Sequence, residues 1–187
     1  VGEKIAPVTF MANGEAYQGA RDRVHDFARV RPGDVARLEA TGAWQRAAEW
    51  TPTLSVILPT RGRPGQLRRV LQSLIETAAD VPVVIVVDRD DQPSIDVVDA
   101  FAGELKILPI VVDPGRTAVQ KWDDGAAVAR GNTLVFGADD IVFRPDWYEL
   151  TVKALRRFPD GSALVGFDDL TGAPHALHYA VTKRLLT

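Results

Sequence analysis

The chain of 187 residues carries a formal net charge of −3 and has no cysteine. This length is typical of one compact domain with a small appendage, and the small, mixed charge argues against nucleic-acid binding, which requires a basic face. The missing cysteines exclude disulfides, thiolate metal sites and cysteine nucleophiles, while the absence of a leader and of any apolar run near the ~18 residues of a membrane span predicts a cytoplasmic protein.

Residues 1–50 differ in pattern from the rest of the chain. Residues 8–10 are apolar, Asn13-Gly14 is a turn signal, and residues 35–40 follow a plausible N-cap and predict a short helix. A segment of ~40–50 residues is too short to hold a robust core alone. We therefore expect a small β-plus-helix module, or an arm that packs on something else.

From Thr53 onward, within an expected domain over residues 51–187, strand-like and helix-like segments alternate. Short apolar runs predict strands over residues 54–58 (ended by Pro59), 81–87, 106–112 and 133–136, and later ones over 162–167 and 177–181. Amphipathic spacing predicts helices over residues 66–79, 94–101 and 117–130, and after Pro145. Four consecutive strand–helix units predict an α/β fold with a mostly parallel, Rossmann-like sheet and helices on both faces.

The same spacing predicts which side chains of the last two helices are buried. Val119, Trp122 and Ala126 are expected to face inward from the helix over residues 117–130. After Pro145, the expected apolar stripe consists of Trp147, Leu150, Ala154, Leu155 and Phe158.

Carboxylates and arginines follow each of the first four expected strands. The four segments are residues 60–65, 88–91, 113–116 and 137–140. Ligands of an open α/β sheet bind beyond the carboxyl ends of its strands, so these residues are expected along one edge. A metal-bridged diphosphate with a sugar and a base requires such groups, and adjacent Asp139 and Asp140 can ligate a hard divalent cation. The alternative is that these aspartates are merely solvated or cap a helix.

Several other sites are excluded by missing motifs. The sequence contains neither Gly-x-Gly-x-x-Gly after the first strand nor Gly-Lys-Ser/Thr, so a dinucleotide fingerprint and a P-loop are absent. No Gly-x-Ser-x-Gly elbow of a hydrolase is present. Asp88-Arg89-Asp90 follows the second strand and lacks the context of an aspartyl-nucleophile phosphatase.

The ordered strand-end segments from Ser55 to about Leu155 resemble family 2 glycosyltransferases, which have the GT-A type of Rossmann-like fold. Residues 55–64 with Leu67 are similar to that family's opening strand, loop and helix, and residues 84–88 to its second strand. Residues 136–147 resemble its Asp-x-Asp region and the helix that follows, with Gly125, Ala129, Gly131 and Asn132 at the preceding helix and turn.

The resemblance implies a role for each matching residue. Donor-binding roles fall on Thr60, Arg61, Arg63, Asp88, Asp90, Arg116 and Asp139, where Asp88 would accept a hydrogen bond from the base, normally uracil. Asp140, with Asp139, would ligate Mn²⁺ or Mg²⁺ on the diphosphate. Arg116 or Lys121 could also contact phosphate, although we favour solvated helix residues for both.

This sequence departs from the family pattern in three places. The metal motif is Ala138-Asp139-Asp140 without an acid at its first position, and Asp123 occupies a slot usually held by Asn. The acceptor half that normally carries the catalytic base is short. Asp168 and Asp169 are candidates for that base, although a solvated turn is the favoured interpretation.

Two functions are therefore expected in order. The first is a metal-dependent glycosyltransferase of the hexosyltransferase type, which moves a sugar from a nucleoside-diphosphate donor (a UDP-sugar first) to an unknown acceptor. The second is a non-catalytic binding or structural protein, located in a virion, because Gly14, Tyr17 and residues 38–44 resemble short modules among phage structural genes. Residues 1–50 would then bind a protein partner or form an oligomer, and a partner chain could supply the acceptor site.

Overall fold

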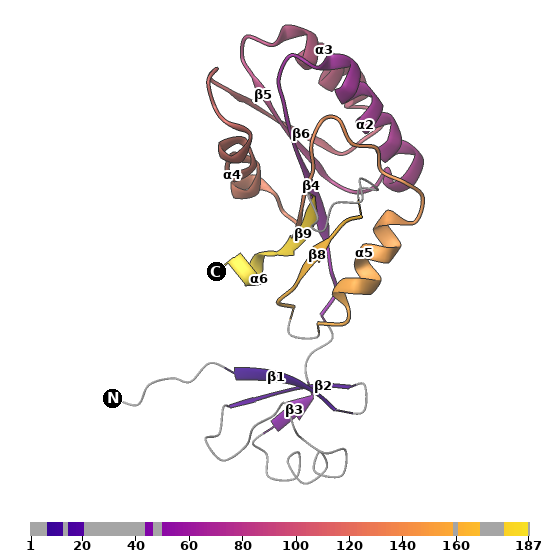
Figure 1. Ribbon diagram of the computed structural model, residues 1–187, viewed down its shortest axis with the longest axis vertical. Coiled ribbons are helices and arrows are strands. Elements are labelled where there is room, and N and C mark those ends of the chain that lie inside the picture. Colours follow the sequence, from indigo (N-terminus) through magenta and orange to yellow (C-terminus); the bar gives the residue numbers. More distant parts are fainter. Residues whose placement is uncertain are drawn as a thin grey trace, which may run out of the picture. The chain divides into compact units, whose positions relative to one another are not determined.

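The computed structural model describes residues 7–12, 15–20, 44–46, 50–158, 161–168 and 178–186. The chain divides into two compact units, the first made of residues 1–51 with 158–161 and the second of residues 52–157 with 162–187. Each unit is considered by itself (Figure 1).

The first unit contains an antiparallel sheet of three strands in the order β1-β2-β3. These strands are β1 (Pro7–Ala12), β2 (Glu15–Ala20) and β3 (Trp44–Arg46). Ala12 pairs with Glu15, so β1 and β2 flank the turn signal predicted at Asn13-Gly14. That turn and the helix predicted over residues 35–40 lie outside the described residues.

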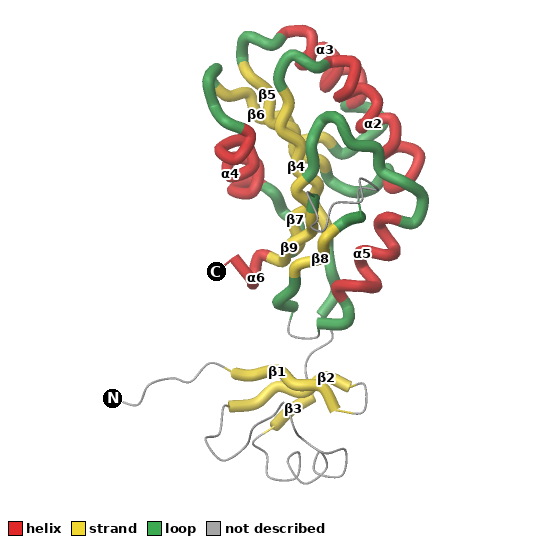
Figure 2. The backbone as a smooth tube through the Cα atoms, viewed as in Figure 1, coloured by secondary structure: helices red, strands yellow, loops and turns green. Residues whose placement is uncertain are grey.

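The second unit is built on a six-stranded sheet in the order β6-β5-β4-β7-β9-β8 (Figure 2). Its strands are β4 (Leu54–Thr60), β5 (Val83–Asp88), β6 (Ile107–Val112), β7 (Thr133–Phe136), β8 (Leu164–Gly166) and β9 (Tyr179–Thr182). The first four strands are parallel to one another, whereas β9 runs antiparallel to both of its neighbours. The mostly parallel Rossmann-like sheet predicted from the sequence is thus confirmed.

Helices cover both faces of this sheet, also as predicted. They are α2 (Pro64–Ala78), α3 (Gln92–Phe101), α4 (Ala118–Val128), α5 (Trp147–Leu155) and the short α6 (Lys183–Leu186). Helix α4 lies on one face, against β4 and β5, and α2, α3 and α5 lie on the other (Figures 1 and 2).

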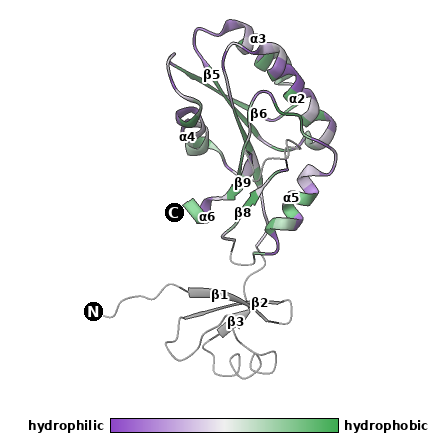
Figure 3. Ribbon diagram, viewed as in Figure 1, coloured by the Kyte–Doolittle hydropathy of each residue, from purple (hydrophilic) through white to green (hydrophobic). Residues whose placement is uncertain are grey.

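The core lies along the two central strands. Every residue of β4 and β5 is buried, which explains why both read as continuous apolar runs rather than alternating ones. Helix α2 covers them with Leu67, Val70 and Leu71, and the sheet forms the apolar centre of the unit in Figure 3.

Proline 59 lies inside β4, so the prediction that it ends this strand is wrong. Strand β4 continues to Thr60 and pairs with β5 up to Thr60–Val87. On its other side β4 pairs with β7 only up to Ile57, so the nitrogen of Pro59, which lacks a hydrogen, faces past the last pair with β7. A proline is tolerated in a strand where its nitrogen has no ladder partner to lose.

Two residues expected to face inward are exposed instead. Val119 of α4 and Leu150 of α5 are each 60% exposed. The buried residues are Lys121 and Gly125 on α4 and Trp147, Thr151 and Leu155 on α5. Each helix is therefore rotated relative to the apolar spacing because small or polar side chains occupy its buried face.

Substitution of Gly131 by Ala should destabilise the second unit by ~1–3 kcal/mol, the usual cost of overpacking a core. A Cβ at this position would lie 2.6 Å from the carbonyl oxygen of Thr53, and backbone atoms cannot rotate away. Urea unfolding would measure the loss. Gly65→Ala is the matched control because its Cβ would meet no atom within 4 Å, and equal destabilisation by both variants would contradict the prediction.

Candidate functional site

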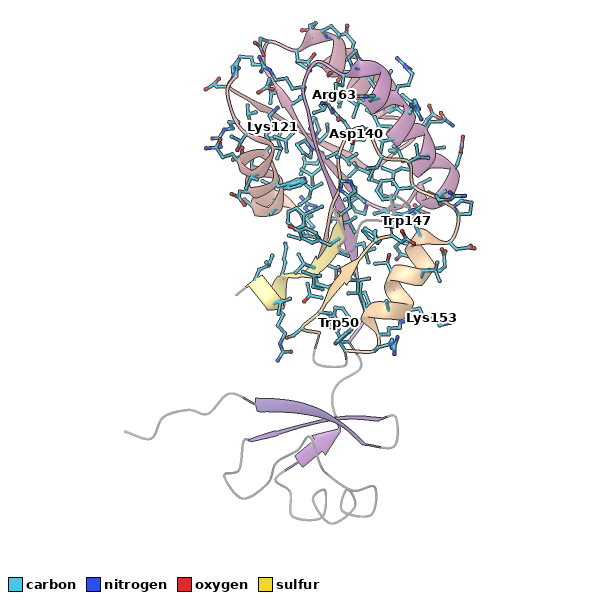
Figure 4. All side chains as sticks on the ribbon, viewed as in Figure 1. Trp50, Arg63, Lys121, Asp140, Trp147 and Lys153 are labelled. Carbon is cyan, nitrogen blue, oxygen red and sulfur yellow. The ribbon has the colours of Figure 1, made fainter. Side chains whose placement is uncertain are left out.

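The candidate site lies where β4, β5 and β7 end. These adjacent strands are parallel, so the residues that follow them come together at one edge of the sheet. Arg63, Lys121 and Asp140 are labelled at this edge in Figure 4. The predicted residues Thr60, Arg61, Arg63, Asp88, Asp90, Asp139 and Asp140 form one set of contacts there.

The carboxylate of Asp88, at the end of β5, is fully buried. Its Oδ2 atom accepts from Lys121 Nζ at 2.5 Å and lies 2.9 Å from a guanidinium nitrogen of Arg61. Arg61 also places both terminal nitrogens on Asp90, at 3.3 and 3.2 Å. Burial alone would raise the pKa of the Asp88 carboxyl, but hydrogen bonds and charge from Lys121 and Arg61 hold that pKa below its ordinary value. Asp88 is therefore an anion, and its Oδ1 atom has no hydrogen-bond partner.

Lys121 is a site residue, and the preferred interpretation as a solvated helix residue is wrong. The side chain is 3% exposed, and Nζ also donates to the carbonyl oxygen of Thr60 at 2.8 Å. Lys121 and Gly125 are four residues apart, so they share the buried face of α4, where a Cβ at Gly125 would collide with Ile57. The small residue one turn later is the sequence signal that could have identified the buried face.

A second pair of carboxylates lies at the end of β7. Thr60 Oγ1 donates to Asp139 Oδ2 at 2.8 Å, and a single guanidinium nitrogen of Arg63 lies 3.3 Å from both Asp139 Oδ1 and Asp140 Oδ2. Asp139 is buried, whereas the side chain of Asp140 is 50% exposed. Asp140 is thus the member of the pair that a ligand can reach.

Asp91 holds the loop between these two clusters, a role that the sequence did not reveal. Its carboxylate accepts from the backbone nitrogen of Gly62 at 2.6 Å and caps helix α3 at Ser94. Burial opposes ionisation of Asp91, but these hydrogen bonds and the charge of Arg61 lower its pKa. Gly62 adopts a φ of 65°, which favours glycine. An Asp before a Gln-Pro helix start is an N-cap signal and could have been noticed.

Arg116 is not part of this set of contacts. It pairs with Asp124 at 3.0 Å and lines a hollow of about 480 Å³ beyond the end of β6, together with Arg89 and Asp113. Its side chain is partly exposed and lies before helix α4 rather than on it, so the expected helical position is wrong.

The two candidates for the catalytic base lie beyond β8. Asp168 follows that strand closely, and β8 runs parallel to β7 because each pairs antiparallel with β9. Asp168 is therefore at the same edge of the sheet as Asp139. Asp169 lies outside the described residues.

Asp139 and Asp140 meet the requirements of a hard divalent cation in one respect. Among residues 50–158, 161–168 and 178–186, no group of three or more His, Cys, Asp or Glu side chains is placed to hold a metal ion. Mg²⁺-type cations, however, bind through one or two carboxylates and take their other ligands from water and substrate phosphates. A buried and an exposed carboxylate at one strand end fit such a site.

Gly137 replaces the first acid of the family motif for a steric reason. A Cβ at this position would lie 2.9 Å from Leu58 and 3.2 Å from Ile141. Its carbonyl oxygen accepts from the indole nitrogen of Trp122 at 2.9 Å. The backbone is thus packed and fixed where other members have a carboxylate.

A six-stranded mixed sheet with helices on both faces and an acidic carboxyl edge defines a GT-A-like Rossmann fold. The family model described as Glycosyl transferase family 2 matches residues 55–181, well over half of the chain. The chain belongs to glycosyl transferase family 2. No protein of curated function matches its sequence significantly.

Three solved structures are similar to the chain at low identity, so they support the fold alone. The mannosyltransferase PcManGT from Pyrobaculum calidifontis, in complex with GDP-Man and Mn²⁺, has 16% identity and a TM-score of 0.60, over 81% of this chain and 51% of that one. TarS 1-349 from S. aureus with UDP-GlcNAc has 16% identity and a TM-score of 0.52, over 61% and 33%. The CMP:2-keto-3-deoxy-manno-octonic acid synthetase with CTP has 13% identity and a TM-score of 0.54, over 72% and 76%.

This chain spans about half the length of PcManGT and a third of the TarS fragment. Within the part of the chain that the structure describes, no helix has the length and apolar character needed to cross a membrane.

Substitution of Lys121 by Met should cost ~3–5 kcal/mol of stability, because it leaves a buried carboxylate without its buried partner. Lys153→Met, an exposed change on α5, should stay within ~0.5 kcal/mol. Urea unfolding measures both, and the double variant Lys121→Met/Asp88→Leu should recover part of the loss. A full sum of the two single losses would contradict a direct Lys121–Asp88 interaction.

Asp88→Asn should weaken the dependence of stability on acid. The folded-state pKa of Asp88 lies below its ordinary value of 3.8, so the ionised carboxylate stabilises the fold above about pH 3.8, and this contribution is lost as the pH falls through the folded-state pKa. The variant should therefore be less stable than the wild type near neutral pH, and the gap should narrow toward about pH 3. Urea midpoints measured across this range test the prediction, which a constant gap would contradict.

Proposed function

We propose that the chain is the donor-binding part of a metal-dependent glycosyltransferase, which transfers a sugar from a nucleoside diphosphate to an acceptor. The observation that carries the proposal is the order of charged groups along the carboxyl edge. Asp88 and Asp90 end β5, Thr60 ends the neighbouring β4, and Asp139 with Asp140 follows β7 on its other side. Strands lie ~4.8 Å apart, so the two carboxylate pairs are ~10 Å apart, a span that suits a base at one end and a diphosphate at the other.

The base subsite is formed around Asp88. Its buried Oδ1 atom lacks a donor, and a ring N–H of a base such as uracil would supply one. The half-exposed guanidinium of Arg61 binds the other carboxylate oxygen, so a base reaches Asp88 when Arg61 moves aside. Lys121 remains with Asp88 and keeps it ionised while the base is bound. Asp90 lies at the entrance and is placed to contact the base or the ribose.

Asp139 and Asp140 would hold Mn²⁺ or Mg²⁺, which would neutralise negative charge on the leaving nucleoside diphosphate. Thr60 fixes the orientation of Asp139 through its hydroxyl. Arg63 is close enough to the same carboxylates for its guanidinium to contact the diphosphate. PcManGT was solved with GDP-Man and Mn²⁺ and TarS with UDP-GlcNAc, which supports a nucleotide-sugar donor. We propose a UDP-sugar first.

The acceptor would approach from the side of β8. Asp168 lies at the same sheet edge two strands from Asp139, which makes it the better-placed of the two base candidates. As general base it would take the proton from the acceptor hydroxyl as that oxygen attacks the sugar. The remaining acceptor contacts would come from a further segment or a partner chain, because similar transferases are longer.

One observation favours a second function, a non-catalytic binding or structural module. Gly137 stands where the family motif has its first acid, and Asp139 is already bonded to Thr60 and Arg63. On this alternative, residues 1–50 would mediate assembly, and their removal would abolish association without changing nucleotide binding. A chain that is monomeric with and without residues 1–50 would count against it.

Isothermal titration with UDP, with and without Mn²⁺, distinguishes the two functions. The proposed enzyme should bind UDP more tightly with Mn²⁺, and Asp140→Ala should remove most of this gain, by about tenfold or more in Kd. Asp80→Ala is a matched control because this exposed carboxylate pairs with Lys106 outside the site. Absence of binding to UDP, GDP and dTDP would overturn the transferase proposal, and unchanged affinity in Asp140→Ala would overturn the metal assignment.

A further inference from the structure

The guanidinium of Arg63 lies between the two carboxylates that are proposed to hold the cation. One of its terminal nitrogens is 3.3 Å from Asp139 Oδ1 and 3.3 Å from Asp140 Oδ2. Figure 4 shows Arg63 and Asp140 close together at the carboxyl edge. The remaining oxygen of Asp139 accepts from Thr60, so Arg63 takes up the oxygen of Asp139 that Thr60 leaves free.

A divalent cation and Arg63 therefore compete for the same oxygens. Carboxylates are hard oxygen ligands that a cation would have to bind directly. Guanidinium cannot lose its charge in a protein, so it would also repel a cation that approached while it remained in place. Cation binding at Asp139 and Asp140 consequently requires Arg63 to leave.

Arg63 can leave at little cost. Its side chain is 53% exposed, as is half of Asp140, and exposed ion pairs contribute little to stability. The backbone beside it need not move, since Gly62 is held by Asp91 at 2.6 Å. The motion is a rotation of one side chain on a fixed loop, on which the guanidinium has water on one side and the carboxylates on the other.

We propose that Arg63 is an exchange residue: it binds Asp139 and Asp140 in the free protein and transfers to the diphosphate when the cation takes its place. The diphosphate part rests on the proposed function. Arginine suits this role because its planar fork matches phosphate oxygens as well as carboxylates. Each ligand then favours the other, since the cation releases Arg63 for the diphosphate and the diphosphate binds the released guanidinium.

The exchange predicts opposite effects of one substitution on two affinities. Arg63→Met should raise the affinity for Mn²⁺ alone by about two- to fivefold, because an exposed competing ion pair is removed. The same variant should lower the affinity for UDP in the presence of Mn²⁺ by about tenfold, because a charged phosphate contact is lost. Electron paramagnetic resonance of free Mn²⁺ measures the first quantity without nucleotide, and calorimetry measures the second.

Two further variants separate exchange from a general charge effect. Arg69→Met removes an equal charge from the exposed face of α2, so its effect on Mn²⁺ affinity sets the baseline that Arg63→Met must exceed. Arg63→Lys keeps the charge and should leave Mn²⁺ affinity near that of the wild type. A Mn²⁺ affinity that is unchanged or reduced in Arg63→Met overturns the exchange, as does an equal increase in Arg69→Met.

The experiment also separates this inference from the proposed function. If the wild type fails to bind UDP with Mn²⁺ while Arg63→Met still binds Mn²⁺ more tightly, the transferase proposal and the transfer to diphosphate fail, and the competition at the carboxylates stands. If UDP binds with Mn²⁺ and Arg63→Met weakens both affinities, the proposed function stands and the exchange is overturned.

Discussion

The site depends on one buried ion pair, Lys121 with Asp88. The ammonium of Lys121 also binds the carbonyl oxygen of Thr60, so one side chain from α4 joins the ends of β4 and β5. Charges are buried at a cost that only close pairing offsets, which ties the position of α4 to the ends of the central strands. The loops that carry Arg61, Arg63 and Asp90 start from these two ends, and their geometry follows from this pair.

Charge balance at the sheet edge explains how so many carboxylates lie together. Asp88, Asp90, Asp91, Asp139 and Asp140 are accompanied by Arg61, Arg63 and Lys121, so negative charge is in excess. The buried carboxylates are paired or hydrogen-bonded, and the excess resides on the exposed ones, where water screens it. An edge of this kind is stable without a ligand and still attracts a cation.

The sequence predicted the architecture well and the site unevenly. Buried parallel strands are continuous apolar runs, so β4, β5 and β7 were recognisable, and the residues after them had to meet at one edge. Lys121 was misassigned because an amphipathic pattern gives lysine to solvent, and only the three-dimensional neighbour Asp88 makes its burial possible. The contacts of Arg63 with Asp139 and Asp140 span more than seventy positions in the chain, and side-chain pairing at that separation leaves no local pattern.

The strand order also constrains how the sheet assembles. Strand β8 pairs with β9 alone, and β9, which comes later in the chain, lies between β8 and β7. During synthesis β4, β5, β6 and β7 can pair as they emerge, whereas β8 has to wait for β9 and join the sheet with it as a two-stranded unit. Asp168 follows β8, so the residue proposed as general base reaches its place in the last folding step, after the edge that would bind the donor has formed.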